Sequence, residues 1–567
     1  MFIRDECVLG HSVGMPTLST ARRRIVSVLA VTVATGAVAL VPATVSTTAA
    51  TPAGVSAPPA PQPDHGGILN TKVAGIDVDA STIPQLQASM NRGRLSSSQL
   101  VRFYERRIAT LNPKLHAVIT VSRTAAAEAA AADKARRNGD RRPLLGIPVL
   151  VKDNIDTTGM ATTAGSLALA GSTPSDAFIV SRLKAAGAVI LGKTNLSEWA
   201  NYRSTQSSSG WSGVGGQTHM AYVLDRNPCG SSAGSGVAAS ADLATVAVGT
   251  ETDGSVVCPS GQNGLVGIKP TLGLASRSGI VPISSQQDTA GPMARNVTDA
   301  AVLLGALTGI DPTDPATAAQ RGKVTADYTK YLKPGALKGA RLGVWREGNF
   351  GSSPETDAIM EQTISRLRSL GAVIVDPANV PIEAAYADEN TALEYEFKTE
   401  IAAYLQKNTS AKYPKTLQDL IAFDNSSPRE LKYFGQEIFT ASQARGPLTD
   451  PAYIKARANA RSVAQHSIDD TMAKYQLDAI VAPTNSPAWT TDLINGDHFL
   501  VGSSSPAAIA GYPNVTVPAG YSFHLPVGVS FMGGRWDEPE LLALTYSWEQ
   551  ATHIRQAPQF LPTVPTE

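Results

Sequence analysis

A lysine at the end of an apolar run and a serine behind an Asp-Gly pair are the residues best suited to catalysis. Lys152 closes the run 146–151. Burial disfavours the ammonium form of a lysine at the end of a core strand, which allows it to act as a base. Ser255 occupies a turn that can present both its hydroxyl oxygen and neighbouring backbone N–H groups. Taken singly, the same patterns also describe a surface lysine paired with Asp153 and an ordinary turn.

A glycine- and serine-rich segment, Pro228 to Gly236, could bring the backbone close to a ligand. Its alternatives are a plain turn entering a helix over 237–243 and a phosphate cradle, although no clean GxGxxG is present. The phosphate-loop pattern GxxxxGK[ST] does occur at Gly187–Thr194. Its middle residues, Ala-Val-Ile-Leu, are typical of a core strand rather than of a flexible loop, so we reject a nucleotide site there.

Cysteine and histidine patterns give no support for a metal site. The three cysteines are Cys7, Cys229 and Cys258, and they form no CxxC pair. The eight histidines show no HExxH spacing. None of them lies in the glycine- and serine-rich motifs, which disfavours a histidine-based catalytic triad.

Composition excludes several classes of protein. The 567 residues carry 48 Lys+Arg and 48 Asp+Glu, a formal net charge of zero. A neutral chain without a basic block gives no electrostatic reason to expect nucleic-acid binding. Hydrophobic residues make up 43%, and charged residues 17% against about 25% in an average soluble protein. Collagen, coiled coil, polytopic membrane protein and wholesale disorder are excluded.

The N-terminal part predicts export. Three arginines, 22–24, precede the apolar run 25–41, and small residues follow, as in a secretory signal. The run is shorter than the roughly 20 residues of a membrane span, which favours a cleaved signal over an anchor. We therefore expect a signal region at 1–50, an Ala/Pro-rich linker at 51–67 and a catalytic domain at 68–567. The mature protein is expected outside the cell membrane, without stable membrane association.

Strand and helix patterns alternate through the domain, which favours an α/β fold. Expected helices cover 83–112, 125–138, 176–186 and 538–553, and expected strands cover 146–152, 188–191, 246–249, 477–483, 513–518 and 527–531. Residues of about 315–470 are richer in charge and in helical pattern, and predict a peripheral helical lobe.

Five motifs in this order resemble the amidase signature family, and the resemblance runs from about residue 83 to residue 551, nearly all of the mature chain. They are Gly146-Ile-Pro-Val-Leu-Val-Lys152-Asp-Asn, Gly192-Lys-Thr-Asn-Leu-Ser-Glu-Trp199, Gly230-Ser-Ser-Ala-Gly-Ser-Gly236, Thr252-Asp-Gly-Ser255 and Gly264-Leu-Val-Gly-Ile-Lys-Pro-Thr271. Within the family the chain is most similar to bacterial peptide amidases, on the segments 210–217, 225–230 and 284–291. The resemblance implies a single domain with a large mixed twisted β-sheet covered by helices on both faces.

The resemblance also implies a Ser–cis-Ser–Lys triad. By motif position the nucleophile is Ser255, the bridging serine is Ser231 and the base is Lys152. The backbone N–H groups of Thr252, Asp253, Gly254 and Ser255 would form the oxyanion hole. Ser232 and Gly230 would support the network, with Gly230–Ser231 as a cis peptide. No cofactor or metal is implied.

The expected activity is hydrolysis of a carboxamide C–N bond through an acyl-enzyme, with C-terminal peptide amides as substrate and ammonia as product. The alternatives are an amidase of small aryl or aliphatic amides, a tRNA-dependent amidotransferase component, which the export signal disfavours, and an exported binding protein with an inactive amidase fold. The expected partner is a small-molecule or short-peptide amide, and the expected state is a monomer. Whether Cys229 and Cys258 form a disulfide stays open at this point. Trp211, Phe434, Phe439 and Trp489 are candidates for an apolar substrate wall or for plain core residues.

Overall fold

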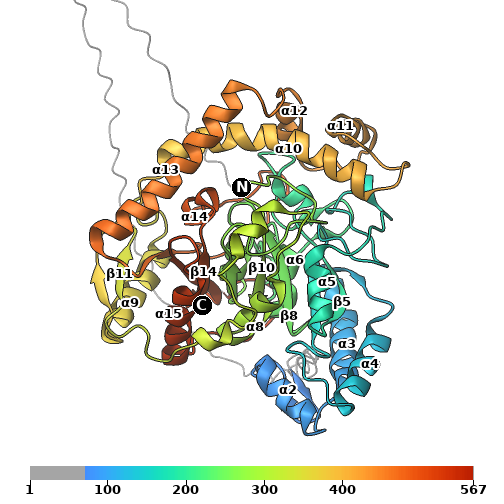
Figure 1. The fold of residues 1–567 in the computed structure, drawn as a ribbon, viewed down its shortest axis with the longest axis vertical. Coiled ribbons are helices and arrows are strands. Elements are labelled where there is room, and N and C mark those ends of the chain that lie inside the picture. The colour runs from blue at the N-terminus through green and yellow to red at the C-terminus, as the bar shows by residue number, and fades with distance from the viewer. Residues whose placement is uncertain (1–69, 566–567) are drawn as a thin grey trace, which may run out of the picture. The chain divides into compact units, whose positions relative to one another are not determined.

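A mixed sheet of 11 strands forms the centre of the chain, for which the computed structural model describes residues 70–565 (Figure 1). The predicted signal region and linker lie outside these described residues. In spatial order the strands are β12 (Val373–Val375), β11 (Arg341–Val344), β13 (Ala479–Pro483), β15 (Leu525–Met532), β14 (Asn514–Ser522), β9 (Val266–Lys269), β10 (Thr289–Ala294), β8 (Val246–Glu251), β4 (Pro148–Lys152), β5 (Val189–Thr194) and β3 (Val118–Val121). The predicted α/β class with a large mixed sheet is confirmed.

Three adjacent strands of this sheet place the polar residues of interest. β4 pairs in parallel with β5 on one side and with β8 on the other. All three strands are buried along their whole length, as expected for parallel strands covered on both faces. Because parallel strands end at the same edge of a sheet, the last residues of β4, β5 and β8 come together there.

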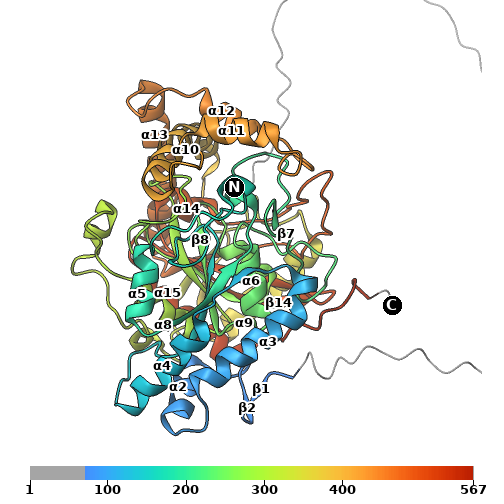
Figure 2. The same ribbon diagram turned by 90° about the vertical axis from the view of Figure 1, so that its right-hand side faces the viewer.

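Helices cover both faces of the sheet (Figure 2). On one face, α6 (Ala233–Ser240) packs on β5, β4, β8 and β10, and lies next to α7 (Val257–Gln262). On the other face, α8 (Val297–Leu307) and α15 (Glu538–Thr552) pack against each other and on β10 and β14. Further helices complete the described domain: α2 (Ile83–Asn91), α3 (Ser97–Leu115), α4 (Ala125–Arg137), α5 (Phe178–Ala185), α9 (Pro354–Ser369) and α14 (Ser505–Ala510).

A layer of four helices, drawn in orange at the top of Figure 1, lies at one end of the sheet. It consists of α10 (Tyr386–Asn408), α11 (Leu417–Ser426), α12 (Glu437–Gln443) and α13 (Pro451–Tyr475). This layer spans fewer residues than the helical lobe expected at about 315–470, because β11 and β12, which lie within that range, belong to the central sheet. These two strands were not predicted from the sequence, because strands of three or four residues between charged segments are too short to show a clear periodic pattern.

The helix expected over 83–112 is divided into α2 and α3. Each part has its own capping box, formed by Thr82 with Gln85 and by Ser96 with Gln99. Gly93, with a φ of +70°, turns the chain between them. Within residues 70–565, no helix is both long enough and apolar enough to cross a bilayer.

Candidate active site

Three neighbouring chain segments carry the predicted catalytic residues, and the structure places Lys152 in contact with Ser231. Lys152 is the last residue of β4, Ser231 lies just before α6, and Ser255 lies in the turn between β8 and α7. The Lys152 Nζ donates a hydrogen bond of 2.7 Å to the Ser231 Oγ. The backbone N–H of Ser232 donates to the carbonyl oxygen of Ser255 at 3.2 Å, which holds the two serine-bearing segments side by side.

Lys152 is fully buried, and the structure gives its ammonium group two hydroxyl partners. Besides Ser231, its Nζ donates to the Oγ1 of Thr250 at 2.9 Å and to the Thr250 carbonyl at 3.2 Å. Burial lowers the pKa of Lys152 to about 7, although the negative charges of Asp288 and Glu251 act in the opposite direction. At neutral pH a large share of Lys152 is therefore uncharged and able to accept a proton.

Two other buried lysines at strand ends show why Lys152 is distinctive. Lys193 of β5 forms an ion pair of 3.2 Å with Asp153, so Asp153 does not pair with Lys152. Lys269, at the end of β9, donates to the backbone carbonyls of residues 270, 507 and 512. Burial lowers the pKa of both, that of Lys269 to about 8. Lys152 differs from both in bonding a serine hydroxyl in the segment next to Ser255.

Ser232 and Gly230 hold the segment that carries Ser231. The Ser232 Oγ donates to the carbonyl of Thr250 at 3.0 Å and accepts from its N–H at 3.1 Å, which fastens the segment to β8. The Gly230–Ser231 peptide bond is cis. A Cβ atom at position 230 would collide with the Oγ of Ser197, so only glycine fits there.

The turn Thr252–Ser255 is supported by two carboxylates. The Oε2 of Glu251 accepts from the N–H groups of residues 256 and 257 at 2.8 and 3.0 Å, after the turn. Asp288 accepts a hydrogen bond of 2.6 Å from the Thr252 hydroxyl. Within residues 70–565, the N–H groups of Thr252, Asp253, Gly254 and Ser255 meet no hydrogen-bond acceptor. Unpaired N–H groups are rare in a folded interior, so these four are available to a ligand oxygen.

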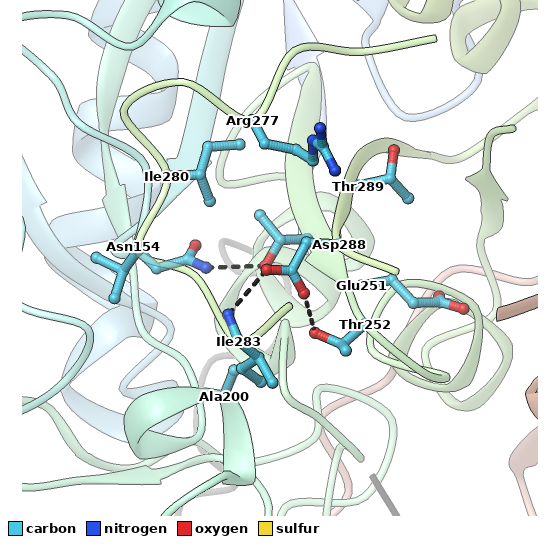
Figure 3. A pocket seen from close by; sticks show the side chains of 11 residues that line it. Asn154, Ala200, Glu251, Thr252, Arg277, Ile280, Ile283, Asp288 and Thr289 are labelled. Carbon is cyan, nitrogen blue, oxygen red and sulfur yellow. Dashed lines mark hydrogen bonds between the residues drawn. The ribbon is translucent and has the colours of Figure 1, made fainter. Parts of the chain in front are cut away.

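A small pocket lies beside this arrangement (Figure 3). It is lined by Asn154, Ala200, Thr250, Glu251, Thr252, Arg277, Ile280, Val281, Ile283, Asp288 and Thr289. Asn154 donates to the same Thr250 hydroxyl that Lys152 uses, at 2.9 Å. A second small pocket shares Asn154, Ala200, Val281 and Ile283 with the first. Open volume thus reaches the residues that surround the lysine.

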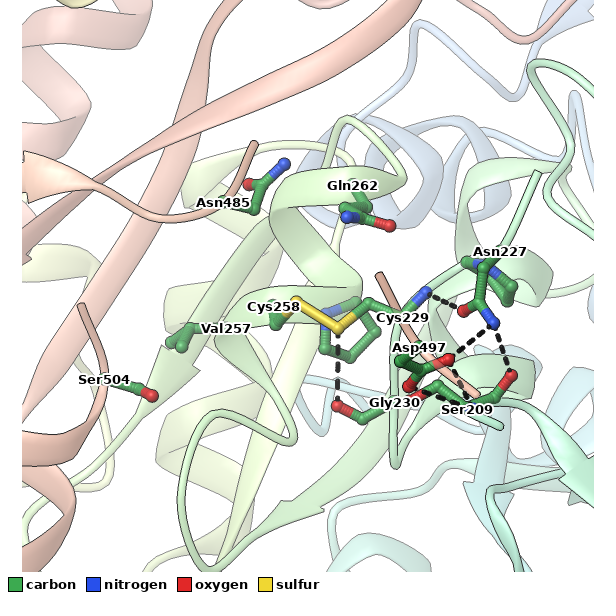
Figure 4. The surroundings of a disulfide bond; sticks show 12 residues. Ser209, Asn227, Cys229, Gly230, Val257, Cys258, Gln262, Asn485, Asp497 and Ser504 are labelled. Atoms are coloured by element: carbon green, nitrogen blue, oxygen red, sulfur yellow. Dashed lines mark hydrogen bonds between the residues drawn. A yellow bond between two sulfur atoms is a disulfide. The ribbon is translucent and has the colours of Figure 1, made fainter. Parts of the chain in front are cut away.

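Cys229 and Cys258 form a disulfide, which the sequence left open (Figure 4). Cys229 lies two residues before Ser231, and Cys258 lies three residues after Ser255. Both cysteines are buried, and Trp489 packs on them.

The four aromatic residues considered as an apolar wall do not form a single surface. Trp211 and Phe434 contact each other with ring centroids 5.1 Å apart. The Arg203 guanidinium lies 4.4 Å from the Phe434 ring centre. Phe439 belongs to a different core cluster, and Trp489 packs against the disulfide. In the part of the chain that the structure describes, there is no group of three or more His, Cys, Asp or Glu side chains that could hold a metal ion.

The sequence reasoning assigned no role to three residues near the lysine. Thr250 accepts a hydrogen bond from Lys152, and Asn154 donates a hydrogen bond to the same Thr250 hydroxyl. Asp288 accepts a hydrogen bond from Thr252, in the turn before Ser255. Asn154 and Asp288 lie inside motifs that the sequence does mark, 146–154 and 284–291. Their tasks depend on the pairing of β4 with β8 and of β8 with β10, which joins distant parts of the chain.

Comparison with known proteins gives consistent matches over most of the chain. The family model "Amidase" matches residues 99–542. A probable amidase of Arabidopsis thaliana is 39% identical over 500 residues, which cover 86% of this chain and 93% of the relative. A putative amidase of Schizosaccharomyces pombe is 35% identical over 525 residues, covering 86% of this chain and 88% of the relative.

Solved structures give a similar result. The native peptide amidase from Stenotrophomonas maltophilia is 49% identical, with a TM-score of 0.82, covering 85% of this chain and 99% of that one. A peptide amidase in complex with the competitive inhibitor chymostatin is 50% identical, with the same TM-score and the same coverage of both chains.

Proposed function

Because this chain belongs to the amidase family and is a hydrolase of amide C–N bonds, we propose that it removes the terminal amide group from peptides that end in a carboxamide. The observation that carries the catalytic part is the buried Lys152, bonded to Ser231 beside the turn of Ser255. The substrate part is supported by the likeness to peptide amidases over 99% of their chains.

The proposed reaction begins with a proton relay. Neutral Lys152 takes the proton of the Ser231 hydroxyl while Ser231 takes the proton of Ser255. The Ser255 oxygen attacks the carboxamide carbon, and the free N–H groups of residues 252–255 bind the resulting oxyanion. One such donor typically lowers the barrier by about 3 kcal/mol.

Collapse of the tetrahedral intermediate breaks the C–N bond. The relay returns its proton through Ser231 to the leaving nitrogen, so ammonia departs and an acyl-enzyme on Ser255 remains. Water then attacks the ester, passes a proton to the relay and releases the peptide as a carboxylic acid. Atoms and charges balance without a cofactor, because the net reaction is amide plus water giving acid plus ammonia.

The test compares peptide amides with their smaller analogues. The mature protein is incubated with a C-terminally amidated peptide, with a small aryl amide and with an aliphatic amide, and free ammonia and product mass are measured. We expect conversion of the peptide carboxamide to the carboxylate with the peptide backbone intact. Turnover of only the small amides would replace the peptide assignment with the alternative substrate class.

Two serine variants isolate the nucleophile. Ser255→Ala is expected to lose activity by several orders of magnitude, in the way that removal of other nucleophiles does. Ser260→Ala, which changes a buried serine of α7 five residues later, is the matched control and should retain activity. Equal activity in the wild type and in Ser255→Ala would refute the nucleophile. Inactivity of the wild type towards all the amides would favour a binding protein with an inactive site.

We also propose that the protein works outside the cell as a monomer, after removal of a signal peptide within residues 1–50. The Cys229–Cys258 disulfide supports this location, since disulfides persist in oxidising compartments. Expression of the full chain, followed by N-terminal sequencing of the protein in the medium and by sedimentation, tests both statements. An intact N-terminus on cell-retained protein would contradict export.

A further inference from the structure

The disulfide joins the two segments that carry the proposed catalytic serines. Cys229 precedes Ser231 by two residues, and Cys258 follows Ser255 by three, and the sequence separation of the two cysteines is 29. Both cysteines are buried, at 0% and 2% exposure. The bond therefore links the proposed bridging serine to the proposed nucleophile by a covalent path that is much shorter than the chain between them.

The Cys229 end of the bond is anchored independently (Figure 4). The N–H of Cys229 donates to the Asn227 side chain at 2.9 Å. The amide group of Asn227 in turn donates to Asp497 at 3.1 Å and to the Ser209 carbonyl at 3.0 Å. This half of the disulfide is therefore held in place even without its sulfur partner.

The Cys258 end lies in a short element. Its N–H donates to the Gly254 carbonyl at 2.8 Å, so Cys258 closes the turn that contains Ser255. α7 has only six residues, and its first N–H groups are held by Glu251. A helix of this length gains little stability from its own hydrogen bonds and depends on packing for its position.

The two attachments hold opposite sides of the turn. On the strand side, Ser232 bonds both backbone groups of Thr250, before the turn. On the helix side, the disulfide attaches Cys258, after the turn. The direct bond between the two segments at the serines, from the Ser232 N–H to the Ser255 carbonyl, measures 3.2 Å, at the long end for such a bond.

We propose that the Cys229–Cys258 disulfide is a positioning element, which keeps the Ser255 turn beside the segment of Ser231, so that the two hydroxyls can come within reach for proton transfer. This inference rests on the proposed catalytic roles of the two serines. Proton transfer needs the two oxygen atoms within hydrogen-bond reach, so a shift of about 1 Å can reduce turnover by about 100-fold. Substrate contacts away from the serines are unaffected, so the loss falls on kcat rather than on KM.

The experiment compares Cys229→Ala/Cys258→Ala with the wild type and with Val237→Ala. Val237 is a buried residue of α6, six positions after Ser231, and the variant controls for loss of apolar volume on the same segment. We expect the double alanine variant to lose about 10- to 100-fold in kcat, with KM changed by less than about threefold. The pH dependence should keep its midpoint, because the contacts of Lys152 are unchanged. Val237→Ala should lose stability while keeping its kcat.

A second measurement covers the case in which the double variant does not fold. Folded wild-type protein is treated with dithiothreitol, which breaks the S–S bond, leaves two thiols and is itself oxidised to a cyclic disulfide. Thiol labelling counts the open molecules, kcat is measured, and the protein is then reoxidised. We expect kcat to fall in proportion to the open fraction and to recover on reoxidation. Folded molecules with both thiols free and with the full wild-type kcat would overturn the proposal.

Failure of the proposed substrate can be told apart from failure of this inference. If no peptide amide is turned over, the same variants are compared by the rate at which a serine-directed phosphonate labels Ser255, which needs no amide substrate. A labelling rate in the double variant equal to that of the wild type would overturn the positioning role. A reduced labelling rate in the double variant would support it, together with a rate in the wild type that falls on reduction and recovers on reoxidation.

Discussion

Protonation of Lys152 by mild acid should switch the enzyme off, and the structure fixes the scale of the effect. Lys152 serves as a base only when it is neutral, and burial lowers its pKa to about 7. The neutral fraction is then about one half at pH 7, about one tenth at pH 6 and about one hundredth at pH 5. We therefore expect kcat/KM to fall about tenfold per pH unit below 7 and to level off above about pH 8.

A lysine in ordinary surroundings would behave differently. With a pKa of about 10.4 it would be neutral in fewer than about one molecule in a thousand at pH 7. Activity would then keep rising about tenfold per unit up to pH 10. The two profiles are distinguishable by initial rates of ammonia release from a peptide amide between pH 5 and pH 10, at constant ionic strength, with circular dichroism confirming the fold at each pH.

Asp288 provides the control, because burial raises the pKa of its own carboxyl to about 6. Its negative charge also raises the pKa of Lys152, so Asp288→Asn should lower that pKa and move the acid limb to lower pH. If the fall of kcat/KM at acid pH disappears in this variant, the fall is due to titration of Asp288, and the role of Lys152 is refuted. A rise in kcat/KM that continues to pH 10 in the wild type would refute the lowered pKa itself.

The same pKa shift affects stability. The unfolded chain regains the ordinary lysine pKa, so between about pH 7 and pH 10 it binds more protons at this position than the folded chain. The contribution of Lys152 to the free energy of unfolding therefore rises with pH across this window and is smallest below pH 7. Urea unfolding of the wild type and of Lys152→Met at pH 6 and pH 9 checks the sign: the wild type should gain more than the variant.

Three further results are expected. Trp548→Ala should lower the free energy of unfolding by about 3–5 kcal/mol, measured by urea unfolding, because a buried indole and its 3.0 Å bond to the Pro518 carbonyl are lost; a loss below about 1 kcal/mol would contradict this. Arg203→Lys should cost about 2 kcal/mol in the same assay, because the buried guanidinium forms an ion pair of 2.8 Å with Glu198 and lies over an aromatic ring; stability equal to the wild type would show that an ammonium group suffices. Dialysis against a chelator should leave kcat/KM unchanged, because the proposed relay uses only side chains and backbone; a loss restored by added metal would refute it.

The sequence predicted the elements that are specified locally. The strands that carry Lys152 and precede Ser255 appear as short apolar runs, because both faces of β4 and β8 are buried. The glycines and serines of 228–236 marked a special backbone, since only glycine fits at position 230. These features depend on residues adjacent in the chain, and the order of the motifs was enough to indicate the family.

Features that depend on distant segments were not predicted. β11 pairs with β12 on one side and, on the other, with β13, which lies more than a hundred residues later. The acceptor role of Thr250 follows from the register between β4 and β8, which places Val151 opposite Val248. The disulfide required two segments to meet, and three cysteines alone allow several pairings.

The helical layer comes from a later part of the chain than the proposed catalytic residues, but it packs on the segments around them through a shared apolar cluster. The proposed catalytic side chains all come from residues 152–255, whereas α10 to α13 span 386–475. Several hydrogen bonds bridge the layer and the segment before β10. Ser284 donates to Glu396, Ser285 donates to Glu400, and Arg457 donates to Gln287 at 2.7 Å. Loss of these bonds would therefore loosen the segment that ends in Asp288, which supports the turn before Ser255. For the same reason, we expect a chimera carrying the layer of another amidase to keep its activity only if these bridging residues are retained.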